Sequence, residues 1–425
     1  MGVLLLVLLI IGLFLLRVPM AFAIMGPCLL YLVLEGYSLG LAVRLAFDGI
    51  DSWPLLAVPL FILVGITATR TQIAALLYDA VELLLGPLRA GLAYVNIGVS
   101  LGFSWMSGAA LADAAGIGSI EVDHMRKKGY PAEFSVGLSA SSALISPIMP
   151  PSIPAVIYAS VAAVSTGALF AAAVVPATLM TIALAITVWV WARGKPHLKG
   201  GPFDWPAIRR AFIKALPPIG APIIILGGIL GGYFTPTEAA GIGALYMLLI
   251  AVAYRTMTAR DVSLIFRDTA IVSAQIMMII GASALLSWIL AREQVPQMVA
   301  EALPALTDNP LVFLLIVNLV LLGLGMILEP TSALLITTPI LLPVAVEFGV
   351  DPLQFGAIVI FNLMIGLLTP PLGGVCFVLS SVTGIPLLRV FRGALIYFPA
   401  LIVVLAMITY VPELTLWLPR ALGLD

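Results

Sequence analysis

Two Pro-Pro pairs interrupt long apolar stretches of this chain, at Pro150-Pro151 and at Pro370-Pro371. Proline removes a backbone donor and clashes with the preceding helical turn, so it leaves carbonyl oxygens without a helical partner. Ser146 and Ser152 flank the first pair, and Thr369 precedes the second. Such carbonyl and hydroxyl oxygens form a neutral cage that suits Na⁺, while a helix starting near Ser152 offers N–H groups to a carboxylate. A kinked helix explains one break equally well, but the recurrence favours a site.

Two further breaks carry polar residues, at Ser104–Gly108 and at Leu328–Ser332, and we expect both to meet the Pro-Pro loops. Glu329 lies deep in an apolar stretch, where a charge is costly and functional by default. Its alternative role is structural, paired with Arg292. Asp113 is a weaker candidate, with helix capping as its alternative role. The candidate Na⁺ ligands are Ser104, Gly108, Ser146, Pro150, Thr331, Gly366, Thr369 and Pro370.

Patterns of other chemistry are weak. Gly98-Val-Ser-Leu-Gly102 fits a nucleophile elbow, but a serine nucleophile needs a base. The two histidines, His124 and His197, lie in basic loops. Cys28 and Cys376 stand alone in apolar runs, which is typical of small buried side chains. We therefore expect no enzyme activity, no disulfide, no cofactor, no ATP-binding motif and no metal other than Na⁺.

The composition is that of a membrane protein. Of 425 residues, 62% are hydrophobic and 10% are charged, and the mean hydropathy is +1.18, whereas soluble domains carry about 25% charged residues. The net charge of −1 gives no reason to expect nucleic acid. Because a crossing helix needs about 20 apolar residues, we expect an all-α fold with about ten crossings, at 2–16, 19–34, 54–69, 132–164, 167–192, 217–234, 236–254, 268–290, 352–382 and 386–411.

Two apolar stretches, 91–125 and 310–346, are too long for one crossing and are broken near their middles, so we predict re-entrant helical hairpins. With residue 1 in the periplasm, this layout places 17 of the 20 basic residues on the cytoplasmic side. Both termini are then periplasmic, and the apolar start of the chain is a retained span. The run 206–216 suits an amphipathic helix at the cytoplasmic interface. The three remaining basic residues are Arg44, Arg292 and Arg420.

The two halves of the chain resemble each other. Gly129-Tyr-Pro-Ala-Glu-Phe is matched by Gly349-Val-Asp-Pro-Leu-Gln-Phe, and the Pro-Pro pairs lie 220 residues apart. The hairpins open toward opposite sides, so the repeats are inverted, which is the architecture of secondary transporters with a site near the midplane. We predict a transport domain from 86–195 and 306–411, a scaffold from 1–85 and 196–305, and a periplasmic tail at 412–425.

Four motifs carry a resemblance to a known family along nearly the whole chain. The most specific is Gly232-Tyr-Phe-Thr-Pro-Thr-Glu-Ala-Ala-Gly241. The chain resembles the large membrane subunit of tripartite ATP-independent periplasmic (TRAP) transporters. The other three motifs are Pro59-Leu-Phe-Ile-Leu-Val-Gly65, Met149-Pro-Pro-Ser-Ile-Pro-Ala-Val-Ile-Tyr158 and Asn362-Leu-Met-Ile-Gly-Leu-Leu-Thr-Pro-Pro-Leu-Gly373.

The resemblance implies a Na⁺-coupled symporter of the elevator type in the bacterial inner membrane. It also implies a separate small four-helix subunit, a periplasmic binding protein as partner, and carboxylate substrates such as C4-dicarboxylates, sialic acid and other sugar or keto acids. By motif position the substrate residues are Ser107, Ser152, Glu329 and Arg292, with Glu at a position where some relatives have Asp. A self-sufficient anion carrier of the same architecture is the alternative, and an intramembrane enzyme is the least favoured.

Overall fold

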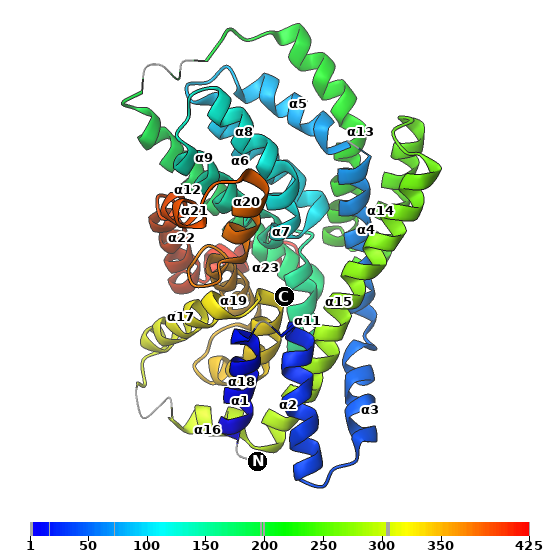
Figure 1. The fold of residues 1–425 in the computed structure, drawn as a ribbon, viewed down its shortest axis with the longest axis vertical. Coiled ribbons are helices and arrows are strands. Elements are labelled where there is room, and N and C mark those ends of the chain that lie inside the picture. Colours follow the sequence, from blue (N-terminus) through cyan, green and yellow to red (C-terminus); the bar gives the residue numbers. More distant parts are fainter. Residues whose placement is uncertain are drawn as a thin grey trace.

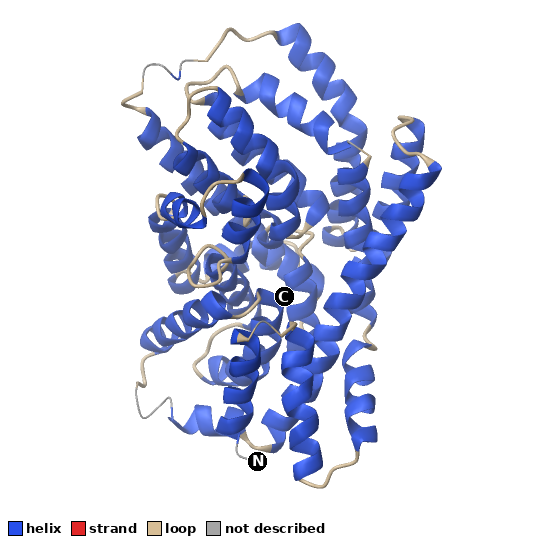
Figure 2. Cartoon of the chain, viewed as in Figure 1, coloured by secondary structure: helices blue, strands red, loops and turns tan. Residues whose placement is uncertain are grey.

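Helices are the regular elements of the computed structural model, which describes residues 3–16, 18–71, 73–195, 198, 200–302 and 307–424 (Figure 2). Within these residues, seven helices are long and apolar enough to cross a membrane, or up to nine if each bent pair is one span. The all-α membrane fold is therefore confirmed. The predicted number of ten crossings stays a prediction, because the helices at 3–15, 20–34, 352–366 and 374–383 are shorter than that criterion.

One group of helices forms the part of the chain predicted as scaffold. The long helix α15 packs against α2, α3 and α4, and α14 packs against α4 and α13. Capping boxes start two of these helices, with Thr235 and Glu238 at α14 and Thr258 and Asp261 at α15. The members are α1 (Val3–Leu15), α2 (Met20–Leu34), α3 (Leu39–Ile50), η1 (Trp53–Leu56), α4 (Ala57–Arg70), α5 (Ile73–Leu85), α13 (Trp205–Leu230), α14 (Pro236–Ala253), α15 (Ala259–Arg292) and α16 (Val295–Ala302).

The run predicted as an amphipathic helix at 206–216 is helical but is not a separate element, and its position at the membrane interface stays a prediction. The structure has one continuous helix, α13, from Trp205 to Leu230, which contains Pro217, Pro218 and Pro222. Prolines inside a membrane helix remove donors without necessarily ending it, because neighbouring groups satisfy the freed carbonyls. One such carbonyl, that of Lys214 four residues before Pro218, accepts a hydrogen bond from the Tyr254 hydroxyl at 3.0 Å.

Both predicted hairpins are present as pairs of helical arms, but their re-entrant course stays a prediction, because Pro310–Ile327 and Pro330–Glu347 are each long and apolar enough to cross a membrane. Hairpin 1 comprises α6 (Gly91–Ser107), α7 (Ala110–Asp113), the π-helical turn η2 (Ala114–Gly118) and α8 (Ser119–Lys127). Its turn is at Gly108, whose φ of +63° is a left-handed conformation that glycine adopts without strain. Hairpin 2 comprises α17 (Pro310–Ile327) and α18 (Pro330–Glu347).

Each Pro-Pro pair divides a helix. The first broken helix consists of α9 (Ala132–Ser142), α10 (Ile145–Ile148) and α11 (Ile153–Ala162), with a bend of 42° between 132–148 and 153–162. The second consists of α19 (Pro352–Gly366) and α20 (Gly374–Thr383). The peptide bonds Pro150-Pro151 and Pro370-Pro371 are both cis. The predicted breaks are thus real interruptions of helical backbone.

The C-terminal part differs from the prediction in two places. The expected single crossing at 386–411 is a pair of helices, α21 (Leu387–Ala394) and α22 (Phe398–Tyr410), bent by 50°. Pro399 lies in the first turn of α22 and lacks the N–H that would bond to the preceding helix, which accounts for the break. The predicted tail at 412–425 contains α23 (Glu413–Ala421), which packs against α12 (Thr166–Ala192). Thr415, Leu416 and Pro419 of α23 are buried.

The two repeats pack reciprocally. The half-helix α11 of the first repeat lies against α18 of hairpin 2, and the half-helix α20 of the second lies against α7, η2 and α8 of hairpin 1. Figure 1 shows α20 beside α8 in the upper half of the molecule and α11 beside α18 below. This exchange agrees with the inverted repeat predicted from the spacing of the Pro-Pro pairs. The division into a moving domain and a scaffold stays a prediction.

A buried polar pair recurs at the same place in each repeat. In the first repeat the Ser142 hydroxyl donates to Asn96 Oδ1 at 2.7 Å. In the second, Asn362 Nδ2 donates to Asn318 Oδ1 at 2.7 Å. The pairs lie 222 and 220 residues apart, which matches the offsets of the hairpin turns and the Pro-Pro pairs. Each pair ties the first arm of a hairpin to the first part of its own broken helix.

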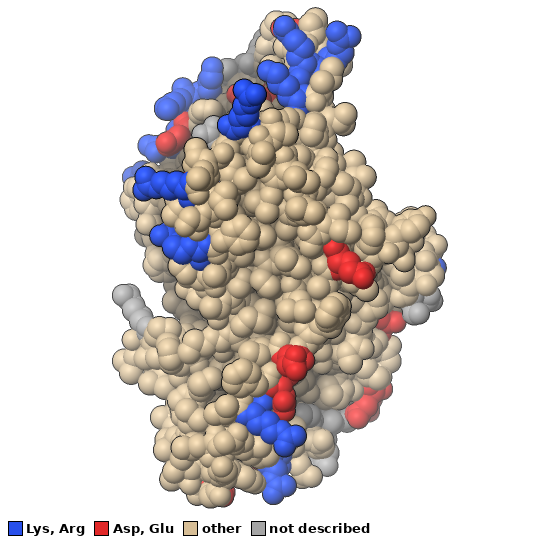
Figure 3. Space-filling model, turned by 90° about the vertical axis from the view of Figure 1, so that its right-hand side faces the viewer, with Lys and Arg blue, Asp and Glu red and all other residues tan. Residues whose placement is uncertain are grey.

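Charge is concentrated toward one end of the molecule. On the face shown in Figure 3, most lysine and arginine side chains lie in the upper half, and a wide belt separates them from a few below; this belt is mostly uncharged but carries several Asp and Glu side chains. A bilayer would cover the uncharged part of this belt. Which end faces the cytoplasm stays a prediction from the basic residues.

Cysteine labelling should establish the orientation. Both native cysteines are buried, so their background should be low. A cysteine replacing Gly201, exposed and with open space around its Cβ, should resist a membrane-impermeant thiol reagent in intact cells. A cysteine replacing Tyr233, which is 81% exposed, should react. Gly200 is unsuitable because its Cβ would lie 1.7 Å from Pro87 O. The opposite labelling pattern would overturn the predicted orientation.

Candidate functional site

The tip of hairpin 1 meets the first Pro-Pro loop, as expected from sequence. A Cβ added at Gly108 would lie 2.9 Å from the carbonyl oxygen of Pro151, so only glycine permits this approach. The Ser107 hydroxyl makes a long contact, 3.5 Å to Ala109 O. Ser104 is buried, and its hydroxyl donates to Leu101 O at 2.6 Å. We refer to this contact between the hairpin tip and the Pro-Pro loop as junction 1.

Ser152 is fully buried at junction 1 and its hydroxyl is already engaged. It accepts a hydrogen bond from Ala155 N at 3.1 Å, which caps α11, and it donates to Pro147 O. In this conformation its donor is used within the break. Near Ser152, the groups best suited to bind an anion are the backbone N–H groups at the start of α11.

Asp113 and Ser146 carry unpartnered side-chain oxygens at junction 1. The Asp113 side chain is 4% exposed and both its oxygens lack a hydrogen-bond partner at normal distance. Its carboxylate nevertheless lies beside the hydroxyls of Ser107 and Ser146, and the Ser146 hydroxyl has no partner either. Asp113 therefore does not cap the return arm of the hairpin. Orphaned buried oxygens of this kind fit a cation.

A second buried carboxylate, Glu121, was missed in the sequence because it adjoins the basic end of 91–125. It is 2% exposed and accepts from Asn96 Nδ2 at 2.5 Å, while Asn96 also donates to Ser139 Oγ at 2.6 Å. Glu121 and Asp113 line the same small pocket. The π-helical turn η2 takes up one residue more than an α-turn, which returns residues eight apart to one helix face.

Junction 2 is the corresponding meeting of hairpin 2 with the second Pro-Pro loop. Gly325 and Gly366 lie back to back, since a Cβ at Gly366 would be 2.5 Å from the backbone of Gly325. The Leu372 N–H donates to Met326 O at 3.3 Å across the same contact. The Thr369 hydroxyl donates to Gly366 O at 2.8 Å, so its oxygen retains a lone pair for a cation.

Glu329 caps helix α18. Its carboxylate accepts from Ser332 N at 3.1 Å and from the Thr331 hydroxyl at 2.9 Å. Arg292 does not come to it: this exposed side chain donates from Nε to the Tyr37 hydroxyl at 3.1 Å. Glu329 thus has the start of its own helix as its partner, and its role in substrate binding stays a prediction.

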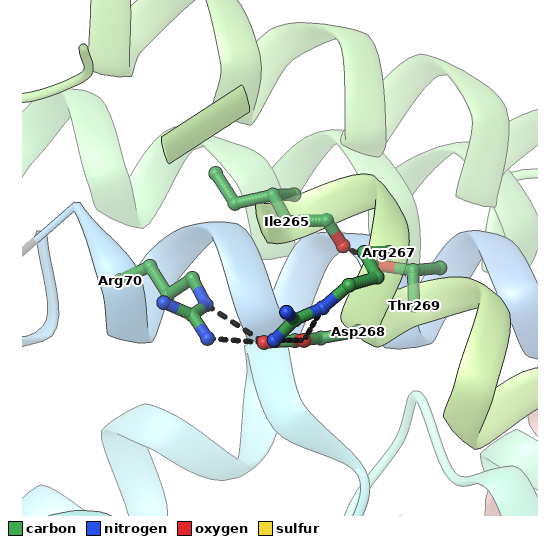
Figure 4. A network of polar contacts seen from close by, with 5 residues as sticks. All are labelled: Arg70, Ile265, Arg267, Asp268 and Thr269. Carbon is green, nitrogen blue, oxygen red and sulfur yellow. Dashed lines mark hydrogen bonds and ion pairs between the residues drawn. The ribbon is translucent and has the colours of Figure 1, made fainter. Parts of the chain in front are cut away.

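A pocket of about 400 Å³ adjoins junction 1 on the scaffold side. Ser107, Ala109 and Ile153 line it from the hairpin and α11, and Arg70 and Asp268 line it from α4 and α15. Figure 4 shows Asp268 between Arg70 and Arg267. Arg70 and Asp268 were not predicted as site residues, since they are 198 positions apart and each lies at the end of an apolar stretch.

At both junctions a hairpin tip lies opposite a break in a helix. Comparison with known proteins shows which family the chain belongs to. Residues 3–414 match the family model described as "Tripartite ATP-independent periplasmic transporter, DctM component". The chain belongs to the DctM family. It is therefore a large permease component of a TRAP transporter and not an enzyme, and the predicted resemblance is confirmed.

Curated relatives of this DctM protein cover almost its whole length. The sialic acid TRAP transporter large permease protein SiaM of Vibrio cholerae is 39% identical over 415 residues, which are 96% of each chain. The C4-dicarboxylate TRAP transporter large permease protein DctM of Pseudomonas aeruginosa is 38% identical over 390 residues, which are 91% of this chain and 90% of the relative. Membership makes this chain a multi-pass membrane protein of a bacterial TRAP system.

The fold is shared more widely than the sequence. The YdaH transporter of Alcanivorax borkumensis superposes with a TM-score of 0.60 at 13% identity, over 90% of this chain and 88% of that one. At this identity the likeness concerns architecture alone. It agrees with the transporter fold predicted from the repeated breaks.

Proposed function

We propose that this DctM chain carries a small organic anion, a carboxylate, across the inner membrane together with Na⁺. The observation that supports it most directly is junction 1, where Ser107 and the start of α11 face an anion-sized space while Ser146 and Asp113 offer unpartnered oxygens. The named substrates of the two relatives, sialic acid and C4-dicarboxylates, are carboxylates.

The residues at both junctions suit Na⁺ as a co-transported substrate. At junction 1 the Ser146 hydroxyl and the Asp113 carboxylate would supply oxygens, beside the backbone of Gly108 and Pro150. At junction 2 the oxygens come from a separate set. It comprises Thr331, Thr369 and the backbone of Gly366 and Pro370. Hard cations prefer oxygen ligands of this kind, and a buried unpartnered oxygen is otherwise costly.

The proposal includes two partners and a motion. A tripartite system needs a small membrane subunit, for which we propose a separate four-helix chain, and a periplasmic binding protein that delivers the anion. Movement of both junctions together past the scaffold, as in an elevator, would expose the site to each side in turn. A Cβ added at Gly65 would lie 3.1 Å from the backbone of Met106 and Ser107, so glycine keeps that boundary free of side chains.

Reconstitution tests the proposed function. Proteoliposomes containing this chain should take up labelled sialic acid or succinate only when the small subunit, the binding protein and an inward Na⁺ gradient are all present. Uptake that persists without the binding protein would favour the self-sufficient carrier instead. Unchanged uptake when K⁺ or choline replaces Na⁺ would remove Na⁺ from the proposal.

Na⁺ binding should also be visible without transport. Because a ligand that binds only the folded state stabilises it in proportion to RT ln(1 + [L]/Kd), the unfolding temperature of the purified protein should rise more in NaCl than in choline chloride. Ser146→Ala should remove much of that difference. The matched control is Ser135→Ala on the same broken helix, whose hydroxyl bonds Pro131 O at 3.1 Å. Equal Na⁺ responses in both variants would exclude Ser146 as a ligand.

A further inference from the structure

The pocket beside junction 1 has a wall that carries an arginine and an aspartate, Arg70 and Asp268. Two scaffold helices form this wall, α4 with Gly65 and Arg70 and α15 with Asp268 and Val272. Hairpin 1 contributes Ser107 to the opposite side. Its volume of about 400 Å³ falls within the range of small-molecule sites, about 300–1,000 Å³. The proposed substrate serine thus shares a cavity with an arginine that no sequence motif indicated.

Two arginines, Arg70 and Arg267, donate hydrogen bonds to the one carboxylate of Asp268. Arg70 donates from Nε to Asp268 Oδ2 at 3.0 Å, and its terminal nitrogen bonds the same oxygen. Arg267 donates to the other oxygen, Oδ1, at 2.9 and 3.1 Å. One carboxylate therefore serves two guanidinium groups (Figure 4).

Resting on the proposed function, we propose that Arg70 is the scaffold residue that binds the substrate's carboxylate, by exchanging Asp268 for it. Arginine can bind a carboxylate through two parallel hydrogen bonds. Asp268 offers Arg70 only one oxygen, Oδ2, so a free carboxylate can replace it. Asp268 keeps its bond to Arg267 when Arg70 turns away, so the exchange leaves no buried charge without a partner. Ser107 donates a hydrogen bond to the same anion from the hairpin side.

The geometry favours Arg70 over Arg292 for this role. Arg292 lies 24 residues beyond Asp268 on α15, which is about 36 Å along the helix. Its guanidinium is bonded to Tyr37, outside the lining of this pocket. Arg70 and Ser107 instead face one cavity, and the side chains of Arg70 and Asp268 are 34% and 24% exposed, so both are accessible to an anion in water.

The competing explanation is that the Arg70–Asp268 ion pair only ties α4 to α15. The two explanations differ in whether changing Arg70 and changing Asp268 have the same effect. A structural tie is lost equally from either side, so Arg70→Gln and Asp268→Asn would have the same effect. If Arg70 binds the substrate, only its replacement weakens substrate binding. Replacing Asp268 removes a competitor for the Arg70 guanidinium. Arg267→Gln should act in the opposite direction to Asp268→Asn, because it leaves Asp268 to Arg70 alone.

The experiment is counterflow of labelled sialic acid and of labelled succinate in proteoliposomes that contain the complete transporter. Arg70→Gln should raise the half-saturating concentration of the transported anion about 10- to 100-fold, by loss of a charged hydrogen bond. Asp268→Asn should lower it, and Arg267→Gln should raise it by a smaller factor. Arg44→Gln, which breaks an exposed Arg–Asp pair on α3, is the matched control and should change nothing.

Thermal unfolding of each purified variant separates binding from folding. Equal losses of transport in Arg70→Gln and Asp268→Asn, restored in the double variant, would overturn the inference and leave a structural tie. A wild type that exchanges neither anion would overturn the proposed function and this inference with it. Wild-type exchange with an unchanged half-saturating concentration in Arg70→Gln would overturn the inference alone.

Discussion

Replacing Gly366 with alanine should abolish transport and lower the unfolding temperature. The new Cβ would lie 2.5 Å from the carbonyl carbon and oxygen of Gly325 and 2.6 Å from its Cα. These are backbone atoms of hairpin 2 and cannot rotate away, so α17 and α19 must separate at junction 2. Overpacking of a buried contact costs about 1–3 kcal/mol or more. Uptake in proteoliposomes and thermal unfolding of the purified protein measure the two effects.

The glycines of hairpin 2 supply a graded control. Gly325→Ala places its Cβ 3.2 Å from Gly366 Cα, a clash that a small shift relieves, so its effect should be smaller. Gly323→Ala meets nothing within 4 Å and should be neutral or slightly stabilising, since alanine favours a helix by about 1 kcal/mol. Equal uptake and equal unfolding temperatures in all three variants would show that junction 2 does not depend on close approach of the two backbones.

Ser107→Ala should cut the apparent affinity for the anion without destabilising the protein. The Ser107 hydroxyl makes a long contact, 3.5 Å to Ala109 O, and lies beside the Asp113 carboxylate, which keeps the Ser146 hydroxyl as a neighbour when Ser107 is changed. If it donates to the substrate's carboxylate, its loss should cost about 1.5–3 kcal/mol, or about 10- to 150-fold in affinity. The uptake rate at a series of substrate concentrations checks this.

Ser152→Ala should behave differently, since its hydroxyl bonds Ala155 N and Pro147 O. Loss of an N-cap costs about 0.5–2 kcal/mol of stability, so the unfolding temperature should fall. Ser152→Asp would restore the acceptor for Ala155 N but place a negative charge beside the proposed anion. A stable Ser152→Ala variant with no uptake would instead show that Ser152 contacts the substrate directly, as the sequence predicted.

Local sequence patterns determined much of this protein. Composition reflects the surrounding solvent, so the membrane class followed from hydropathy alone. Proline and glycine act on their own backbone and immediate turn, and for that reason the breaks at Pro150-Pro151 and Pro370-Pro371 and the turn at Gly108 were predictable. The repeat was visible because its two copies retain those residues at a nearly constant offset.

The partner of each polar group was decided only by the tertiary structure. Ser152 and Ser107 are equivalent in sequence terms, yet one hydroxyl is engaged within its own break and the other faces a cavity. Arg70 meets Asp268 across 198 residues, and α20 reaches hairpin 1 from the opposite repeat. Hydrogen bonds form only near 3 Å, so their partners depend on how distant helices pack. A pattern of residue types along one chain does not contain that information.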